Sequence, residues 1–468
     1  MLNAFGAVPV PSENAGKAYM KDLTQQNIYK TFFLFGAPLV LAGLLAQAYG
    51  IIDTSIAGKM IGDKGLAATG ATSPLTTAIS SLFWGFGVGF SVWLARLFGE
   101  RKYEKIKSSV ALSFMIQLIV AGVIVAICLI FHDGIFDLLR VDEEIRKEAY
   151  EYFSFYIVGL VFIVFNNTFL FILNAFGIST FTLYMSLLAT VLNIGGNILL
   201  VSLGLGVAGL AISSVFAAVA VDGCYLLKLH ACYKEMGVGT AKITFKNLGF
   251  SASLAYALPN MAQQGVMYLS SLLLSPLVNG MGASASAAYT VALTVFNLIQ
   301  AVYCNSSKAV SNYSAQCVGL HKYRGLKKGL GVGVLQGLAF TLPFIVVCSV
   351  LPDKVCSLFF KADADALSRE YAELFARTYV PFMVFAILNN LFHALYRGVK
   401  ASAFLFSSTF VGAAVRWIAS FLLISKYGMP GFFAGWAISW VGEALYAFAL
   451  FLTGRWNPAR REATESRD

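Results

Sequence analysis

Long apolar runs recur along the whole chain, separated by short polar segments. Each run is about as long as the ~20 residues that a helix needs to cross a bilayer. Strands of a membrane barrel would alternate polar and apolar positions and would be about half as long, so the runs predict helices. Twelve runs meet this description: 30–57, 70–97, 108–131, 150–174, 180–203, 206–229, 251–279, 285–317, 329–351, 371–397, 402–425 and 430–453.

The composition supports this prediction. The chain of 468 residues is 58% hydrophobic and 12% charged, whereas soluble proteins carry about 25% charged residues. We therefore predict an all-α polytopic membrane protein. The first 28 residues are mixed and polar and do not resemble a cleavable signal peptide. The seven cysteines lack paired spacing, so no disulfide framework is expected.

Basic residues gather in alternate connections between the runs. "RKYEKIK" (101–107) and "HKYRGLKK" (321–328) are basic, whereas "DLLRVDEEIRKE" (137–148) and "KADADALSRE" (361–370) are rich in acids. Cytoplasmic loops carry the excess of Lys and Arg, so both termini are predicted to be cytoplasmic. The basic cytoplasmic loops then explain the net charge of +10, so we expect no nucleic-acid partner.

The two halves of the chain repeat one another at an offset of about 220 residues. The matching positions include Ser91 and Ser311, Ala95 and Ala315, Gly99 and Gly319, Pro38 and Pro259, Asn166-Asn167 and Asn389-Asn390, and "AGLAIS" (208–213) and "AGWAIS" (434–439). Six spans per half predict two parallel six-helix lobes, related by a pseudo-twofold axis along the membrane normal. The predicted units are a cytoplasmic segment (1–29), an N-terminal lobe (30–229), a linker (230–250), a C-terminal lobe (251–453) and a cytoplasmic tail (454–468).

A duplicated helical bundle is typical of secondary transporters, which bind substrate between the repeats. The sequence contains no GxxxxGK[ST] phosphate loop, and neither HExxH nor GxSxG. We therefore predict a transporter without enzymatic activity, driven by an ion gradient or by the gradient of its substrate.

Five motifs occur in the order found in the multidrug and toxic compound extrusion (MATE) family. They are "IIDTSIAG" (51–58) with its Asp fifteen residues after Pro38, "MIGDKGLAATG" (60–70), "GVGFSVWLARLFGERKYEK" (87–105), "VLNIGGNILLV" (191–201) and "GVAGLAISS" (206–214). The chain resembles this family over residues 30–455.

The resemblance implies a V-shaped pair of lobes that exports cationic or amphipathic organic compounds in antiport with H⁺ or Na⁺, with no other cofactor. It also implies a cation site in the N-terminal lobe, which falls on Asp53, Asn193, Asn197 and Ser214. Many members have a second Asp where this chain has Asn197. The acids that some sodium-coupled members carry in the other lobe fall here on Tyr268 and Ala386. We expect a monomer in a bacterial inner (cytoplasmic) membrane, with the lipid bilayer and small-molecule substrates as its partners.

Asp53 stands out on physical grounds as well. An Asp at the bilayer centre costs about 2.5–3.5 kcal/mol. A carboxyl group away from water binds a proton more readily, and as a carboxylate it can attract Na⁺. The alternatives are an acid exposed at a helix end and a structural bond to a neighbouring helix. Asn193 and Asn197 are four residues apart and share a helix face, where they either line the cation site or pack between helices.

Five polar residues of the second half are candidates for the substrate cavity: Gln264, Tyr268, Asn297, Lys308 and His393. Lys308 could snorkel to the cytoplasm, pair with an acid, or line a water-filled cleft and favour anionic substrates. His393 either titrates near neutral pH or is a hydrogen-bonded core histidine. Arg416 and Glu443 are two further charges within predicted spans; they either form a structural pair, which we favour, or contact the substrate.

Two rival functions remain open. The first is a lipid-linked oligosaccharide flippase or an anionic-metabolite exporter of the same superfamily, although such flippases usually have fourteen spans. The second is a membrane protein that binds or senses a ligand without transporting it.

Overall fold

The computed structural model describes residues 20, 22–24, 27–139, 141–243, 250–360 and 365–460. Within these ranges the chain forms helices and no strands, as the sequence predicts. The predicted N-terminal segment, linker and C-terminal tail each lie partly outside the described residues.

The first half of the chain contains eight α-helices and three short π or 3₁₀ segments. In order they are α1 (Ile28–Ile56), η2 (Ala57–Ile61), α2 (Asp63–Gly99), α3 (Tyr103–Ile130), α4 (His132–Leu138), η3 (Glu143–Ile145), α5 (Arg146–Val158), α6 (Leu160–Ala175), α7 (Ser179–Leu200), η4 (Val201–Leu205) and α8 (Gly206–Glu235).

The second half has the same plan. It consists of α9 (Phe250–Asn279), α10 (Ala283–Gly319), α11 (Gly325–Val350), α12 (Pro352–Ser357), α13 (Ala366–Leu374), η5 (Phe375–Tyr379), η6 (Val380–Phe382), α14 (Met383–Gly398), α15 (Ser402–Tyr427) and α16 (Met429–Leu452).

Nine helices of the described part are long and apolar enough to cross a membrane, or up to ten if the bent pair α5–α6 counts as one span. One of the nine, Ser179–Glu235, is 57 residues long and contains both α7 and α8. The break between them falls at η4 and the start of α8, where Gly204 has φ 87° and Gly206 has φ 53°, a conformation that glycine adopts without steric cost. Membrane helices are thus confirmed, and the count of twelve stays a prediction.

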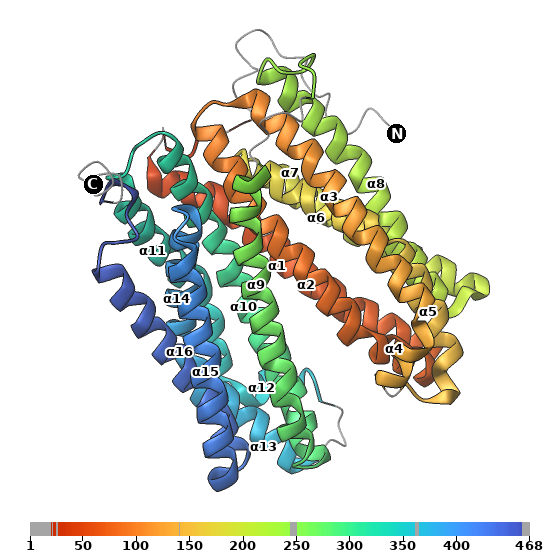
Figure 1. Ribbon diagram of the computed structural model, residues 1–468. Coiled ribbons are helices and arrows are strands. Elements are labelled where there is room, and N and C mark those ends of the chain that lie inside the picture. Colours follow the sequence, from red (N-terminus) through yellow and green to blue (C-terminus); the bar gives the residue numbers. More distant parts are fainter. Residues whose placement is uncertain are drawn as a thin grey trace.

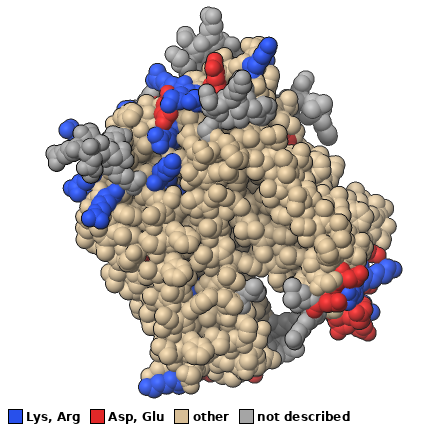
Figure 2. Space-filling model, viewed as in Figure 1, with Lys and Arg blue, Asp and Glu red and all other residues tan. Residues whose placement is uncertain are grey.

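The surface is that of a protein surrounded by lipid. Large apolar side chains such as Ile130, Leu227 and Phe421 are exposed along the helices, in a quantity that soluble monomers do not tolerate. In Figure 2 the charged side chains lie at the two ends of the molecule, and the surface between them is almost free of charge.

Two helical bundles form a V (Figure 1). The N-terminal lobe (α1–α8) and the C-terminal lobe (α9–α16) meet at one end, which we call the base, and diverge toward the end that carries α4 and α13. Figure 2 shows that most Lys and Arg side chains lie near the base, whereas many Asp and Glu side chains lie at the free tip of the N-terminal lobe.

At the base the lobes approach each other closely through a glycine and its own repeat. A Cβ atom added to Gly99 would overlap the backbone of Gln316, and one added to Gly319 would overlap the backbone of Arg96. Arg96 and Gln316 are themselves equivalent positions of the repeat. The two halves therefore make the same glycine-to-backbone contact with each other. Small residues are enriched where membrane helices pack backbone to backbone.

Side chains reinforce this junction between the lobes. Ser91 donates to Asn312 Oδ1 at 3.1 Å, and Gln316 Nε2 donates to the carbonyl of Ala175 at 3.2 Å. Arg96 Nη1 donates to the Tyr256 hydroxyl at 3.0 Å. Because these bonds connect α2 with α9 and α10, and α6 with α10, they fix the base without holding the open ends of the V.

Helix α1 belongs to both lobes. Near its start, the carbonyl of Phe32 accepts from Gln336 Nε2 of α11 at 2.7 Å, and the Phe32 ring packs edge-on against Tyr313 of α10. Beyond Pro38, its second half binds α7 and α8 of the N-terminal lobe through Tyr49 and Asp53. A change at the far end of α1 can therefore reach the C-terminal lobe along one continuous helix.

We expect Gly319→Ala to destabilise the protein. The added methyl group would push α10 away from α2, and such overpacking typically costs about 1–3 kcal/mol. Thermal unfolding of the purified protein in detergent measures the loss. Gly331→Ala is the matched control, because a Cβ at Gly331 of α11 would meet open space; it should leave the melting temperature unchanged or slightly raised. Equal melting temperatures for the two variants would contradict the close contact at the base.

Candidate cation site and cleft residues

Asp53 is hydrogen-bonded to a helix that is distant in sequence. Its Oδ1 accepts from Asn197 Nδ2 of α7 at 2.6 Å. The same nitrogen also donates to Asn193 Oδ1, one turn earlier on α7, at 2.9 Å. The spacing of the two asparagines thus places both side chains on the face of α7 that meets α1.

The network continues into α8. Asn193 Nδ2 donates to Ser214 Oγ at 2.9 Å, and the Ser213 hydroxyl is bonded to Asn197 Oδ1. Tyr49, one turn before Asp53 on α1, shares a hydrogen bond of 3.0 Å with Ser214 Oγ. Three helices are therefore joined by one connected set of polar side chains.

Burial divides this network into a closed part and an accessible part. Asn197 and Ser213 are fully buried and Asn193 is only 2% exposed. Asp53 is half-buried, and it is the one carboxylate bonded into this network among the described residues. An ion that enters the network can reach Asp53 directly, while the buried amides fix the position of its carboxylate.

The structure thus brings together all four residues predicted for the cation site. Sequence reasoning missed Tyr49 and Ser213. Tyr49 could have been predicted from the sequence, since it lies four residues before Asp53 and therefore shares its helix face. Ser213 is adjacent to the predicted Ser214, and only the rotation of α8 shows that both hydroxyls face α7.

A protein-family model, MatE, matches this chain twice, over residues 38–199 and 259–422. The chain belongs to the MATE family. The two matches begin at Pro38 and Pro259, which are equivalent residues of the internal repeat. MATE proteins are membrane transporters and not enzymes, which confirms that part of the prediction.

The chain is similar to MATE relatives over nearly its full length. It is 23% identical over 446 residues to the probable multidrug resistance protein YpnP of Bacillus subtilis, covering 94% of this chain and 98% of YpnP. It is 24% identical to the probable multidrug resistance protein YoeA of the same species, covering 72% and 74% of the two chains.

Solved MATE structures have the same fold. An outward-facing multidrug resistance MATE transporter matches with a TM-score of 0.85 at 20% identity, covering 94% of this chain and 97% of its own. The bent form of the Vibrio cholerae transporter VcmN matches with a TM-score of 0.82 at 17% identity, covering 91% and 96%. The two-lobed architecture expected for a MATE protein is therefore confirmed.

In the C-terminal lobe, His393 is a buried histidine with several hydrogen-bonding neighbours. Its Nδ1 lies 3.0 Å from Gln263 Nε2 and its Nε2 lies 2.7 Å from Ser408 Oγ. Glu443 Oε1 is 3.6 Å from His393 Nε2. Arg416 and Glu443 attract each other but are not among the ion pairs within 4.0 Å that the described residues form; the Arg416 guanidinium lies 4.3 Å from the centroid of the Trp436 ring.

Three other cavity candidates lie apart from this cluster. The Tyr268 hydroxyl donates to the carbonyl of Pro74 on α2, and Gln264 lies against Gly85 of the same helix. Both residues therefore face the α2–α9 contact. Asn297 on α10 is exposed.

Each lobe also holds a carboxylate on its last helix, Asp222 or Glu443, near an asparagine that is equivalent in the repeat. Asn166 Nδ2 donates to Asp222 Oδ1 at 3.0 Å, and Asn389 lies near Glu443 and favours its carboxylate form. Asn166 and Asn389 are equivalent in the repeat. The repeat thus preserves an interior Asn–acid pair as well as the helix order.

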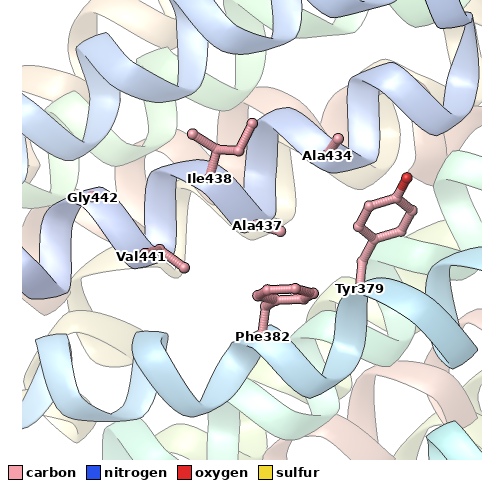
Figure 3. Close-up of a pocket in the computed structure, with 7 residues that line it drawn as sticks. All are labelled: Tyr379, Phe382, Ala434, Ala437, Ile438, Val441 and Gly442. Atoms are coloured by element: carbon pink, nitrogen blue, oxygen red, sulfur yellow. The ribbon is translucent and has the colours of Figure 1, made fainter.

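A cavity of about 370 Å³ lies between α16 and the η5–η6 segment of the C-terminal lobe (Figure 3). The lining residues are almost entirely apolar: Tyr379, Phe382, Ala434, Ala437, Ile438, Val441 and Gly442. It contains none of the predicted site residues and offers little to a polar group, so we assign it no role in the site.

We expect Asn197→Ala to destabilise the N-terminal lobe. The change removes the donor to Asp53 and leaves Asn193 Oδ1 without its bond, which costs about 1–3 kcal/mol. Thermal unfolding of the purified protein measures the effect. Asn167→Ala is the control, since Asn167 donates within its own helix to the Ile163 carbonyl; it should cost less. If Asn167→Ala lowers the thermal stability more than Asn197→Ala does, the network does not stabilise the N-terminal lobe as we expect.

Proposed function

We propose that this MATE protein exports organic compounds in antiport with H⁺ or Na⁺, and that Asp53 binds the coupling ion. The observation that carries the proposal is the half-buried Asp53 carboxylate, held at 2.6 Å by an amide of a fully buried polar network. A multidrug transporter is also what the names of its relatives describe.

Of the two ions, the hydrogen bonds favour H⁺. The amide oxygen of Asn193 already accepts from Asn197, and that of Asn197 is bonded to Ser213. Hard cations such as Ca²⁺ and Mg²⁺ are held by several oxygen ligands at once, and we extend this requirement to Na⁺. Such a shell would have to break those bonds. A proton binds to a single oxygen atom, so it requires no such shell. In Asp53, Oδ1 is the carboxylate oxygen that accepts the hydrogen bond from Asn197.

Helix α1 gives the bound ion a route to the other lobe. A proton on Asp53 removes the negative charge that Asn197 stabilises and changes how α1 is held against α7. Because the first half of α1 packs on α10 and α11, that change alters the contact between the lobes. Ion and substrate then bias one equilibrium between conformations and reduce each other's affinity.

The distribution of charge suggests the direction of transport. The base carries most of the basic side chains, and basic residues mark the cytoplasmic side. The V in Figure 1 would then open outward, with both termini cytoplasmic, as in a transporter ready to release substrate and to take up an external ion. We place the protein in a bacterial inner membrane, as a monomer.

Dye transport in proteoliposomes tests the coupling. The wild-type protein should drive uphill dye movement with a pH gradient, and Asp53→Asn should reduce that movement to the level of protein-free liposomes while the variant remains monodisperse. The neutral amide cannot exchange a proton in this pH range. If Asp53→Asn transports normally, Asp53 is not the coupling residue.

Two further measurements make this test specific. A sodium gradient at constant pH should drive no dye movement; sodium-driven transport alone would contradict H⁺ as the ion. Asp222→Asn is the matched control, because Asp222 is a second buried aspartate of the same lobe, bonded to Asn166. Pronounced uncoupling by Asp222→Asn together with normal coupling by Asp53→Asn would move the ion site to α8.

A further inference from the structure

The two lobes carry opposite charges in their interiors. Among the described residues, the acids Asp53 and Asp222 lie within the helices of the N-terminal lobe. The corresponding charges of the C-terminal lobe are mostly positive: Lys308, Arg397, Arg416 and the single acid Glu443. Arg416 stacks on Trp436 and is attracted by Glu443, which leaves Lys308 and Arg397 to be explained.

Among the residues that the structure describes, Lys308 has no acidic partner. Its ammonium donates one hydrogen bond, to the neutral Asn305 Oδ1 at 2.7 Å. It also lies 5.2 Å from the ring centroid of Trp84 and 4.9 Å from that of Phe171. No carboxylate of the described residues lies within ion-pair distance of it. The predicted alternative of an ion-paired lysine is therefore wrong for the part of the chain that the structure describes.

Arg397 adds a second positive charge to the same region. It lies in the last turn of α14, and helical side chains tilt toward the N-terminus of their helix. The next residue, Gly398, lies against the backbone of Ser311 on α10, about one turn after Lys308, and Asn390 of the same helix donates to Cys304, one turn before Lys308. The tilt therefore directs the Arg397 guanidinium toward the ammonium of Lys308, in agreement with the repulsion between the two charges. Arg397 Nε is buried without a hydrogen-bond acceptor among the described residues. Two cations brought together inside a membrane protein without a counter-ion are unfavourable.

The surroundings of Lys308 suit an amphipathic ligand. Trp84 and Phe171 belong to α2 and α6 of the N-terminal lobe, whereas Lys308 and Arg397 belong to α10 and α14 of the C-terminal lobe. A molecule bound here would contact aromatic surface from one lobe and positive charge from the other. Its binding would therefore depend on the angle between the lobes.

We propose that Lys308 and Arg397 bind an anionic group of the transported compound, with Trp84 and Phe171 packing against its apolar part. The substrate class is then amphipathic anions or zwitterions that carry a carboxylate, sulfonate or phosphate. This inference rests on the proposed transport function and concerns the charge of what is carried. The anion comes either from a soluble compound or from a lipid headgroup.

Helix α1 connects this anion site with Asp53. The Asn305 amide that holds Lys308 lies against Gly43 of α1, where an added Cβ would overlap it. Gly43 is ten residues before Asp53 on the same helix, about 15 Å along its axis. A shift of α1 caused by the coupling ion would therefore displace Asn305 and with it the ammonium of Lys308.

Equilibrium binding of two related dyes tests the proposal. Fluorescein is anionic and rhodamine 6G is cationic, and both have a xanthene ring system. In phosphatidylcholine nanodiscs without any ion gradient, fluorescence anisotropy should show tighter binding of fluorescein by the wild-type protein. Lys308→Gln should weaken fluorescein binding by about tenfold or more, and Lys308→Arg should retain most of it. Rhodamine 6G binding should not weaken.

The matched control is Lys426→Gln, which removes the same charge from an exposed position at the end of α15; it should bind both dyes as the wild-type protein does. If wild type and Lys308→Gln bind fluorescein alike, including not at all, the anion site is wrong. It is equally wrong if the wild-type protein prefers rhodamine 6G.

Two comparisons complete the test. One distinguishes a lipid headgroup from a soluble anion as the ligand, and the other distinguishes failure of the anion site from failure of proton coupling at Asp53. Phosphatidylglycerol added to the nanodiscs should displace fluorescein from the wild-type protein if the natural ligand is a lipid headgroup, and leave it bound if the ligand is a soluble anion. Because the binding assay uses no gradient, its failure leaves proton coupling at Asp53 intact. Normal transport by Asp53→Asn would overturn the coupling and leave the anion site intact.

Discussion

A bilayer offers a polar side chain no water, so each polar group inside a span needs a partner within the protein. This constraint explains much of the interior of the molecule. Asn193, Asn197 and the serines of α8 satisfy one another and hold the carboxylate of Asp53. His393 finds Gln263 and Ser408 in the same way. Lys308, by contrast, has only the neutral Asn305 amide and two aromatic rings around its ammonium among the described residues.

The second organising element is α1, which is shared between the lobes. Most helices of this protein belong to one lobe. A conformational change that involved only such helices would not affect the other lobe. Helix α1 packs on α10 and α11 near its start and again on α10 at Gly43, and it binds α7 and α8 through Asp53 and Tyr49 in its second half. The ion site and the proposed anion site lie against the same helix, at Asp53 and Gly43. Coupling between them requires no chain of small side-chain movements, because ten residues of one continuous helix join the two places.

Much of this organisation could be predicted from the sequence. The apolar runs predicted the membrane helices, the repeat predicted the two lobes, and "IIDTSIAG" pointed to Asp53. The i, i+4 spacing of Asn193 and Asn197 placed both on one helix face. These features are local or periodic, and local geometry fixes them.

The contacts between distant helices could not be predicted in this way. Glu443 lies beside His393 rather than in direct contact with Arg416, and Lys308 lies between aromatic rings of the opposite lobe. Such contacts depend on the rotation and tilt of each helix, which packing decides. The bend between α5 and α6 was likewise not visible in a continuous apolar run; it amounts to 48°.

The glycine contact at the base has a consequence for the origin of the protein. Gly99 packs on the backbone of Gln316, and Gly319 packs on the backbone of Arg96, so each half presents the same surface to the other. A surface that is complementary to itself is what a symmetric homodimer uses. A single six-helix ancestor could have assembled through this patch before its gene was duplicated and fused. Once fused, the copies were free to diverge, and one half could become acidic inside while the other became basic.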